Sequence, residues 1–593
     1  MTARKGIQQI LQNQMDTWRG RMFFSACLTL LFVGLTAALL RITFLTNDDA
    51  SIMYTFAGYF TGDPYPIHGF VNLPLGGLTS LLYMMLPQVP WWPVLELLCV
   101  AISIWVIFYT LWDIGKVNGV SHAAMIIILT LLYALVLVYP VARLSFTMTA
   151  CMLGTAGVLR LFALDVGAAA GEPRALLVLL ESLALMISCF LFRNSTGFSM
   201  LCFWAAGVVY LALRIGFCWA PELKRLNLKR LGVYTLVGVA VFSALIWLNG
   251  WSNQNMNPDG YAAFEEARGE FFDFPHVSYD EDPAFYASLG WDKETYDLVS
   301  NACFIDPNVT EASLRAIVAH GAADAPQGLG ERLKGALAYG ETFFRTNGAA
   351  QYQLVVPAIT ALTAAFYFLR GRKRWVELLI AVGLVLGAFA LCLYLCLVQR
   401  LILRAFQVIA VPTAVLLLPL LLRIRGENAA LPPKRWGRWV GIAIVLLSLF
   451  GLSWSATKTV LWFHSYQPEK QIANMRAAED YAMEHPKGVY IIQPTFIYNN
   501  EAFKSYPDQK PTNIIDWGDT GMHSGWKTRQ LEVNGLNALT PEIFSRENVY
   551  LMGTKDAKEL QVLVDYLVKD AGATGIERVD SFGDGYAIYK VVY

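Results

Sequence analysis

The feature that most constrains this chain is a series of long apolar segments that recurs along most of its 593 residues. Runs such as Leu416–Leu422 and Ile442–Leu452 contain no charged residue. Only 16% of all residues are charged, against about 25% in typical soluble domains. This pattern excludes a soluble enzyme, a disordered protein and a coiled coil, and it predicts a polytopic α-helical membrane protein with soluble parts attached.

Membrane spans need about 20 apolar residues, and about eleven segments of the chain are candidates. They lie near 22–45, 93–113, 121–140, 145–164, 175–193, 197–215, 232–249, 353–370, 375–398, 402–422 and 439–461. Cations in short loops stay on the cytoplasmic side of a membrane, and with eleven spans they all fall on the side of the N-terminus. These cations are Arg4, Lys5, Arg19, Arg21, Lys116, Arg174, Lys224, Arg225, Lys229, Arg230, Arg370, Arg372, Lys373, Arg374, Arg423, Arg425, Lys434, Arg435 and Arg438. We therefore expect a multi-pass protein of the cell membrane with a cytoplasmic N-terminus.

The apolar segment Leu73–Val89 tests this count. It is short, is interrupted by Gly76 and Gly77, and is bounded by prolines. If it spanned the membrane, every later basic loop would move outside, against the charge rule. We therefore expect a helix that lies at the outer surface, or a re-entrant helix covered by protein.

The topology divides the chain into a transmembrane module, 1–461, and a C-terminal extracytoplasmic domain, 464–593. Within the module, the first outer loop (46–92) lacks Lys and Arg, and a second outer loop of about a hundred residues covers 250–351. The C-terminal domain alternates helical and strand patterns, which predicts a small α/β fold. Its expected elements are helices at Gln471–Glu484 and Lys555–Lys569, strands at Gly488–Gln493 and Asn548–Met552, and a hairpin of Ile576–Phe582 with Tyr586–Tyr593.

Two adjacent carboxylates, Asp48 and Asp49, follow the first span immediately. Ionisable groups at a membrane boundary are functional candidates, although a solvated span end is the simpler interpretation. We favour function because the rest of the loop, with His68, Asn72 and several turn formers and aromatic residues, is unlike a linker. His68 and Asn72 are therefore candidates for substrate binding.

Four arginines stand at the outer ends of spans, where the charge rule disfavours cations: Arg143, Arg193, Arg400 and Arg404. The planar guanidinium suits phosphate oxygens, whereas the alternative role is snorkelling to the lipid headgroups. Four-residue spacing would place Arg400 and Arg404 on one helical face, so for this pair we favour phosphate binding. In the second outer loop, Arg268 and Asp273 stand among aromatic residues and could line an acceptor pocket, without a catalytic role.

Outward carboxylates with cations near the same membrane surface suit a lipid-linked phosphosugar. The cations would hold the phosphate and stabilise the leaving group, and a carboxylate would take the proton of the attacking hydroxyl. One base suffices for such an inverting displacement, unlike the two carboxyl groups of a glycosidase. Alternatively, the two carboxylates could hold a divalent cation, Mg²⁺ or Mn²⁺, at the phosphate.

One span, the outward pair Asp48-Asp49 and a long first outer loop together resemble the GT-C superfamily of membrane glycosyltransferases. Protein O-mannosyltransferases and aminoarabinose transferases share this plan. The resemblance implies a polyprenyl-phosphate sugar donor, a glycan, lipid or protein acceptor in the cell envelope, and Asp48 as base or metal-side carboxylate supported by Asp49. By location it also implies that Arg400 or Arg404 contacts the donor phosphate. Transfer of a whole glycan to asparagine is disfavoured, because the chain lacks a WWD-type signature.

Other functions remain open from the sequence. A transporter or flippase of lipid-linked saccharides predicts internal symmetry and polar residues near mid-membrane, whereas the polar residues here gather at the outer ends of spans. A sensor or scaffold would leave the polar first loop without a role. A polymerase or ligase of surface polysaccharide is a close enzymatic alternative. The equal numbers of basic and acidic residues, 46 each, give no indication of a nucleic-acid partner.

Overall fold

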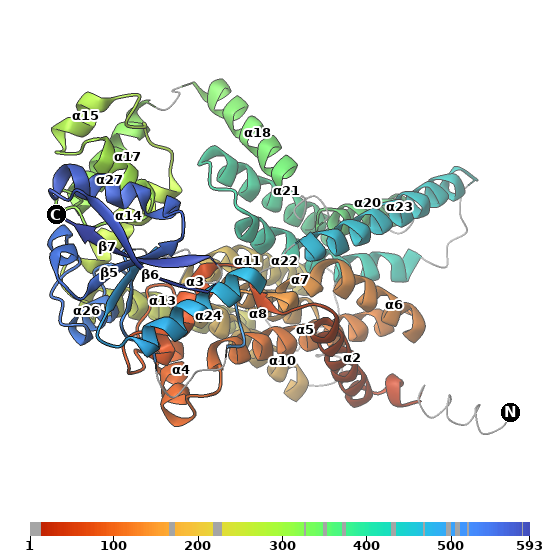
Figure 1. Ribbon diagram of the computed structural model, residues 1–593. Coiled ribbons are helices and arrows are strands. Elements are labelled where there is room, and N and C mark those ends of the chain that lie inside the picture. Colours follow the sequence, from red (N-terminus) through yellow and green to blue (C-terminus); the bar gives the residue numbers. More distant parts are fainter. Residues whose placement is uncertain are drawn as a thin grey trace. The chain divides into compact units, whose positions relative to one another are not determined.

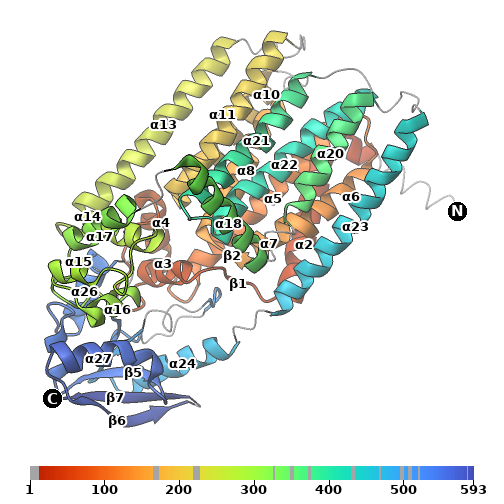
Figure 2. The same cartoon turned by 90° about the horizontal axis from the view of Figure 1, so that it is seen from above.

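The computed structural model describes residues 13–164, 172–217, 228–324, 328–347, 353–370, 375–428, 435–465, 469–493, 500–504, 510–518, 521–583 and 585–593. Several predicted loop cations, among them Lys224, Arg225, Arg372 and Lys434, lie outside these ranges. The chain forms two compact units (Figures 1 and 2). Unit 1 comprises 1–42, 95–246 and 334–466, and unit 2 comprises 43–94, 247–333 and 467–593.

Unit 1 is a bundle of helices. Its elements are α2 (Trp18–Leu39), α5 (Trp91–Val117), α6 (His122–Leu132), the π-helix η1 (Tyr133–Leu137), α7 (Val138–Ala142), β2 (Arg143–Leu144), α8 (Phe146–Phe162), α10 (Glu172–Phe192), α11 (Asn194–Phe217), α13 (Leu228–Asn255), α18 (Leu329–Thr346), α20 (Val355–Arg370), α21 (Trp375–Leu397), α22 (Leu403–Asn428) and α23 (Arg435–Ser465). Of these, α5, α13 and α18 run across the boundary between the units.

Within the described ranges, nine helical segments are long and apolar enough to cross a membrane. The predicted spans at 145–164 and 353–370 are also helices, α8 and α20, but they have only 17 and 16 residues. Every residue of α8 is buried, and 89% of the apolar window in α22 is buried. These two helices therefore form the centre of the bundle, and the predicted class of a polytopic helical membrane protein is confirmed.

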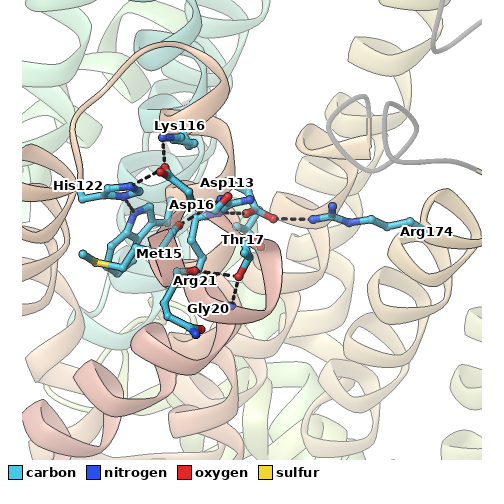
Figure 3. Close-up of polar contacts among 12 residues, drawn as sticks. Met15, Asp16, Thr17, Gly20, Arg21, Asp113, Lys116, His122 and Arg174 are labelled. Atoms are coloured by element: carbon cyan, nitrogen blue, oxygen red, sulfur yellow. Dashed lines mark hydrogen bonds and ion pairs between the residues drawn. The ribbon is translucent and has the colours of Figure 1, made fainter. Parts of the chain in front are cut away.

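Buried ion pairs tie helices together at one end of the bundle (Figure 3). Asp113 of α5 accepts from Arg21 of α2 at 2.5 Å and from Arg174 of α10 at 3.0 Å. Arg160 of α8 pairs with Glu181 of α10 at 2.7 Å, and Arg214 of α11 pairs with Glu377 of α21 at 3.0 Å. Because buried charges need partners, each pair fixes which helix ends can lie side by side.

Unit 2 gathers three separate stretches of the chain. Its elements are β1 (Thr43–Phe44), α3 (Asn47–Ala57), α4 (Leu73–Met85), α14 (Tyr261–Asp273), α15 (Pro283–Ser288), α16 (Lys293–Ser300), α17 (Glu311–Asp324), α24 (Glu469–Glu484), β3 (Val489–Ile492), β4 (Ile514–Asp516), α26 (Gly525–Val533), the 3-10 turns η2 (Pro541–Ser545) and η3 (Lys558–Leu560), β5 (Val549–Thr554), α27 (Gln561–Asp570), β6 (Gly575–Phe582) and β7 (Tyr586–Val592).

The five-stranded sheet of unit 2 has the order β4-β3-β5-β7-β6. β3 is parallel to both neighbours, while β7 is antiparallel to β5 and β6. One hydrophobic core joins Ile491 and Leu551 of this sheet to Phe271 and Leu314 from the second outer loop. Part of the second outer loop and the C-terminal segment therefore fold as one body.

The predicted elements of the C-terminal domain are present, with two differences. The helix expected from Lys555 begins as a 3-10 turn, and its α-helical part starts only at Gln561. Strand β4, of three residues, and helix α26 were missed, because segments this short give little periodic signal.

Candidate active site

The two carboxylates of the first outer loop occupy the first turn of α3. Asp49 is fully buried and accepts a hydrogen bond from the hydroxyl of Thr46 at 3.0 Å. Asp48 is partly exposed. Carboxylates in a first turn stabilise a helix through its dipole, so both side chains have a structural effect besides any chemical one. Of the two, Asp48 is the one that solvent or a ligand can reach.

The chain after α3 is fixed by a glycine and a lysine. Gly58 caps the helix with φ of +62°, and a Cβ atom there would lie 2.1 Å from the backbone of Asp63. Only glycine tolerates both conditions. Lys510 donates to the carbonyls of Ala57 and Gly62, both at 2.9 Å, which ties this turn to the C-terminal segment.

A buried ion pair anchors the middle of α3. Lys504 and Glu479 contact each other, with side chains only 5% and 4% exposed. The Lys504 ammonium lies over the rings of Tyr54 and Tyr59, at 5.4 and 4.6 Å from their centroids. These two rings stack on each other at 4.9 Å. The C-terminal segment therefore fixes the helix that carries Asp48, and no local sequence pattern indicated these partners.

His68 and Asn72 lie in the turn between α3 and α4. Burial lowers the pKa of His68 to about 4, against the opposing effect of the Asp48 charge. His68 is therefore neutral at pH 7 and near enough to Asp48 to feel its field. Asn72 is buried at the N-terminus of α4, where its carbonyl accepts from Leu75 at 3.0 Å. This part of the loop thus brings His68 close to Asp48, while Asn72 lies at the start of the next helix four residues further on.

A glycine lets α4 pack against this turn. A Cβ on Gly76 would lie 2.1 Å from the carbonyl oxygen of Pro66, so the glycine that interrupts the apolar pattern serves a close backbone contact. α4 has 13 residues, about 20 Å at 1.5 Å per residue, whereas a bilayer core is about 30 Å thick. Leu81, Met84 and Met85 are exposed on it. These features suit a helix that lies at a membrane surface.

The donor set at α3 does not fit a divalent cation held by the protein. Adjacent residues of a helix do not face each other, and Asp49 is enclosed and bonded to Thr46. Among the residues that the structure describes, there is no group of three His, Cys, Asp or Glu side chains that could hold a metal ion. We therefore derive no catalytic step through a metal.

Arg268, the predicted acceptor-site residue, is buried on α14 and pairs with Glu265 at 3.0 Å. The second carboxylate oxygen of Glu265 accepts from the backbone N–H of Gly521 at 2.9 Å. Arg268 thereby helps to fix α14 against the C-terminal segment. Its predicted role in substrate binding stays a prediction.

The four outer arginines all belong to unit 1, at the end of the bundle opposite the ion pairs of Figure 3. Arg143 is buried before α8, donates to the carbonyls of Arg41 and Ala142, both at 2.9 Å, and lies over the ring of Phe463. Arg193 donates to the hydroxyls of Ser195, at 2.8 Å, and Thr147. Arg143 is therefore held inside the protein, whereas Arg193 is partly exposed but still bonded to protein groups.

Arg400 is exposed, and Arg404 is partly exposed. The expectation that they share one helical face is wrong, because α21 ends at Leu397 and α22 begins at Leu403. Arg400 lies in the link between these helices, while Arg404 is in the first turn of α22. Positive helix N-termini attract anions, so Arg404 adds its charge where the dipole of α22 already favours a phosphate.

Two cavities of unit 1 meet at the same link. The larger, of about 580 Å³, is lined almost entirely by apolar side chains of α18, α20, α21 and α22, including Phe344, Phe389 and Leu401. The smaller, of about 280 Å³, is lined by Thr342, Asn347 and Leu401–Leu403, among others. Leu401 belongs to both linings, so the apolar cavity and the more polar one are neighbours beside the link that carries Arg400.

No protein-family model and no curated protein matches the sequence. Among solved structures, the chain is similar to the crystal structure of ArnT from Cupriavidus metallidurans bound to undecaprenyl phosphate. The identity is 12% and the TM-score is 0.39, over 96% of this chain and 98% of ArnT. At this TM-score the likeness carries no argument about activity.

Proposed function

We propose that this protein is a GT-C-type glycosyltransferase that moves a sugar from a polyprenyl-phosphate donor to an acceptor of the cell envelope. The observation that carries the proposal is the pair of neighbouring cavities, one apolar and one more polar, that share Leu401 at the link between α21 and α22. The apolar cavity suits an isoprenoid chain, and Arg400 in the link with Arg404 in the first turn of α22 would bind the phosphate. A lipid with an apolar tail and an anionic head group would match this arrangement.

The first outer loop would supply the base. Asp48 would accept the proton of the acceptor hydroxyl as its oxygen attacks the anomeric carbon of the donor sugar. The bond between that carbon and the phosphate oxygen breaks, and its electron pair leaves with the polyprenyl phosphate. Arg400 and Arg404 would stabilise the charge that develops on this leaving group. The attack from the opposite face inverts the anomeric configuration.

The remaining predicted residues take supporting roles in this proposal. The neutral His68 and the buried Asn72 belong to the same outer loop as Asp48 and would position the sugar or acceptor. Arg143 and Arg193 add positive charge near the start of α8, and Arg268 would act at the acceptor side. The proposed membrane orientation is the predicted one, with Asp48 and the C-terminal segment on the extracytoplasmic face.

The test is transfer from a panel of polyprenyl-phosphate sugars by the full chain in lipid nanodiscs. Asp48→Asn removes the proton acceptor and should lower kcat by about 10²–10⁴-fold, the usual range for a general base. Asp63→Asn is the matched control, because Asp63 is an exposed carboxylate of the same loop whose partner is Arg529. Normal turnover of Asp48→Asn, or an equal loss in Asp63→Asn, would reject the proposed base.

A further inference from the structure

The sheet of unit 2 carries a groove of about 930 Å³ that the proposed transfer chemistry does not use. Its walls come from the C-terminal end of α24, the link that follows it, and strands β3, β5, β6 and β7. Ligand sites commonly have volumes of about 300–1,000 Å³. The groove is therefore large enough for an extended ligand.

The groove forms because the two faces of the sheet differ. Side chains alternate along a strand, and Ile491, Leu551 and Tyr589 point into the hydrophobic core. Their neighbours Tyr490, Tyr550 and Lys590 belong to the opposite face and line the groove. Helix α24 lies along this face (Figure 2) and ends at Glu484, so the face beyond its end stays open.

Aromatic rings form the floor and one wall. Tyr490 and Tyr550, on adjacent strands, stack with centroids 5.9 Å apart and an interplanar angle of 24°. His485 is exposed and stacks on Tyr481 at 4.2 Å, and Tyr481 meets Tyr490 edge to face at 5.6 Å. Tyr490 is buried beneath the other rings, so His485, Tyr481 and Tyr550 offer the accessible aromatic surface, and aromatic faces attract C–H groups.

Polar groups along the groove are held in place by bonds within unit 2. The hydroxyl of Tyr481 donates to Asp580 at 2.8 Å, and Lys590 donates to the carbonyl of Val549 at 3.0 Å. The Lys590 ammonium also lies 5.4 Å from the centroid of Tyr550. These contacts fix donors and acceptors beside the aromatic rings, which gives directional recognition of hydroxyl groups.

The charges of the groove are mixed. Glu484, Glu547 and Asp580 are opposed by Lys487 and Lys590. Such a balance gives no net attraction for a phosphate or a nucleic acid, whose sites are strongly positive. The polar lining also disfavours a lipid chain. A ligand that suits these surfaces has apolar C–H faces for the rings, many hydroxyl groups and no net charge.

We propose that this groove is a binding site for an uncharged oligosaccharide, separate from the site of transfer. A pyranose ring offers a C–H face to tyrosine and histidine rings, and its hydroxyls suit the Asp580 carboxylate and the Lys590 ammonium that are held beside them. The inference does not rest on the proposed function. A saccharide site here would hold a glycan chain to the protein whichever reaction unit 1 supports.

The test is saturation-transfer NMR with the full chain in nanodiscs and three soluble probes: maltotriose, mannotriose and the trimer of N-acetylglucosamine. At least one trisaccharide should bind, and His485→Ala and Tyr550→Ala should each weaken that binding by about 2–10-fold, as expected for one aromatic contact. Tyr593→Ala is the matched control, because Tyr593 is an exposed ring that does not line the groove. Its binding should equal that of the unaltered protein.

Three outcomes would overturn the proposal: no binding of any probe, binding that survives both His485→Ala and Tyr550→Ala, or competition by inorganic phosphate. His485 is exposed, so its variant keeps the test decisive if Tyr550→Ala fails to fold. Asp48→Asn separates this proposal from the transferase. That variant should bind the trisaccharide normally while transfer is lost, and a joint loss would contradict a separate site.

Discussion

The two ends of the helix bundle in unit 1 use arginine in different ways. At the end drawn in Figure 3, Arg21 and Arg174 both contact Asp113. Arg160 of α8 likewise contacts Glu181 of α10. At the opposite end, Arg143 donates to two backbone carbonyls and Arg193 to two hydroxyls. A carboxylate contact neutralises a guanidinium, whereas a contact to a carbonyl or hydroxyl orients it.

This difference separates structural arginines from candidate ligand-binding ones. A neutralised pair exerts little field on an anion nearby, so its contribution is to the packing of helices. Contacts to carbonyl and hydroxyl oxygens fix the direction of a guanidinium before any ligand binds, and fixed donors are what a phosphate site requires. The contacts of an arginine therefore say more about its role than its position at a span end does.

The largest effect expected from this comparison is on stability. Asp113→Asn would leave the guanidinium groups of Arg21 and Arg174 without their shared carboxylate. Breaking a buried ion pair costs about 3–5 kcal/mol, so we expect a clearly lower thermal unfolding midpoint in detergent. Transfer activity per folded molecule should stay near normal. If Asp113→Asn were inactive but as stable as the unaltered protein, the ion-paired end of the bundle would have a functional role. The proposed difference between the two ends would then be wrong.

A pH prediction tests whether burial, rather than the nearby Asp48 carboxylate, decides the charge of His68. Beside Asp48, burial lowers the pKa of His68 to about 4, whereas an unfolded histidine titrates near 6.5. Because the unfolded chain binds this proton first, stability should fall as the pH drops from about 6.5 to 4, by on the order of 1–2 kcal/mol at pH 5. His68→Gln should lose less stability over that interval in detergent melts. Identical pH profiles would mean that His68 is not desolvated.

A smaller effect is expected at the cationic end. Arg400→Gln removes one charged contact to the donor phosphate, worth about 1.5–3 kcal/mol for a hydrogen bond to a charged group. We expect KM for the polyprenyl-phosphate donor to rise about tenfold or more with an unchanged unfolding midpoint, because Arg400 is exposed. Donor saturation curves measure this directly. An unchanged KM would assign Arg400 to lipid headgroups instead.

The sequence indicated much of the fold because membrane spans and amphipathic elements have local, periodic signals. The predicted spans, β3, β5 and the β6–β7 hairpin are present, whereas α18 lies within the stretch that was predicted as the second outer loop. Helix α3, whose first turn carries Asp48 and Asp49, was also not predicted. What failed was the helical spacing of Arg400 and Arg404, because a five-residue link interrupts the periodicity that the argument assumed.

The supports of the candidate site were beyond the reach of sequence patterns. Lys504 and Lys510 lie more than 440 residues from Tyr54 and Ala57, the residues that they contact. The core that joins Phe271 to Ile491 likewise brings together distant stretches of the chain. Such contacts depend on how the three stretches of unit 2 fold together, which no local pattern in this chain encodes.

The smallest expected effect belongs to an exposed pair beside Asp113. Lys116 and His122 both contact Asp16 (Figure 3), but the Lys116 and Asp16 side chains are 41% and 43% exposed. Water screens such a pair, and exposed salt bridges contribute about 0–1 kcal/mol. Lys116→Gln should therefore leave the unfolding midpoint and transfer nearly unchanged, which makes it the matched control for Asp113→Asn. If Asp113→Asn and Lys116→Gln were destabilised equally, the burial of the Asp113 ion pairs would not explain the loss of stability. Any charged pair at this end of the bundle would then contribute, whether buried or exposed.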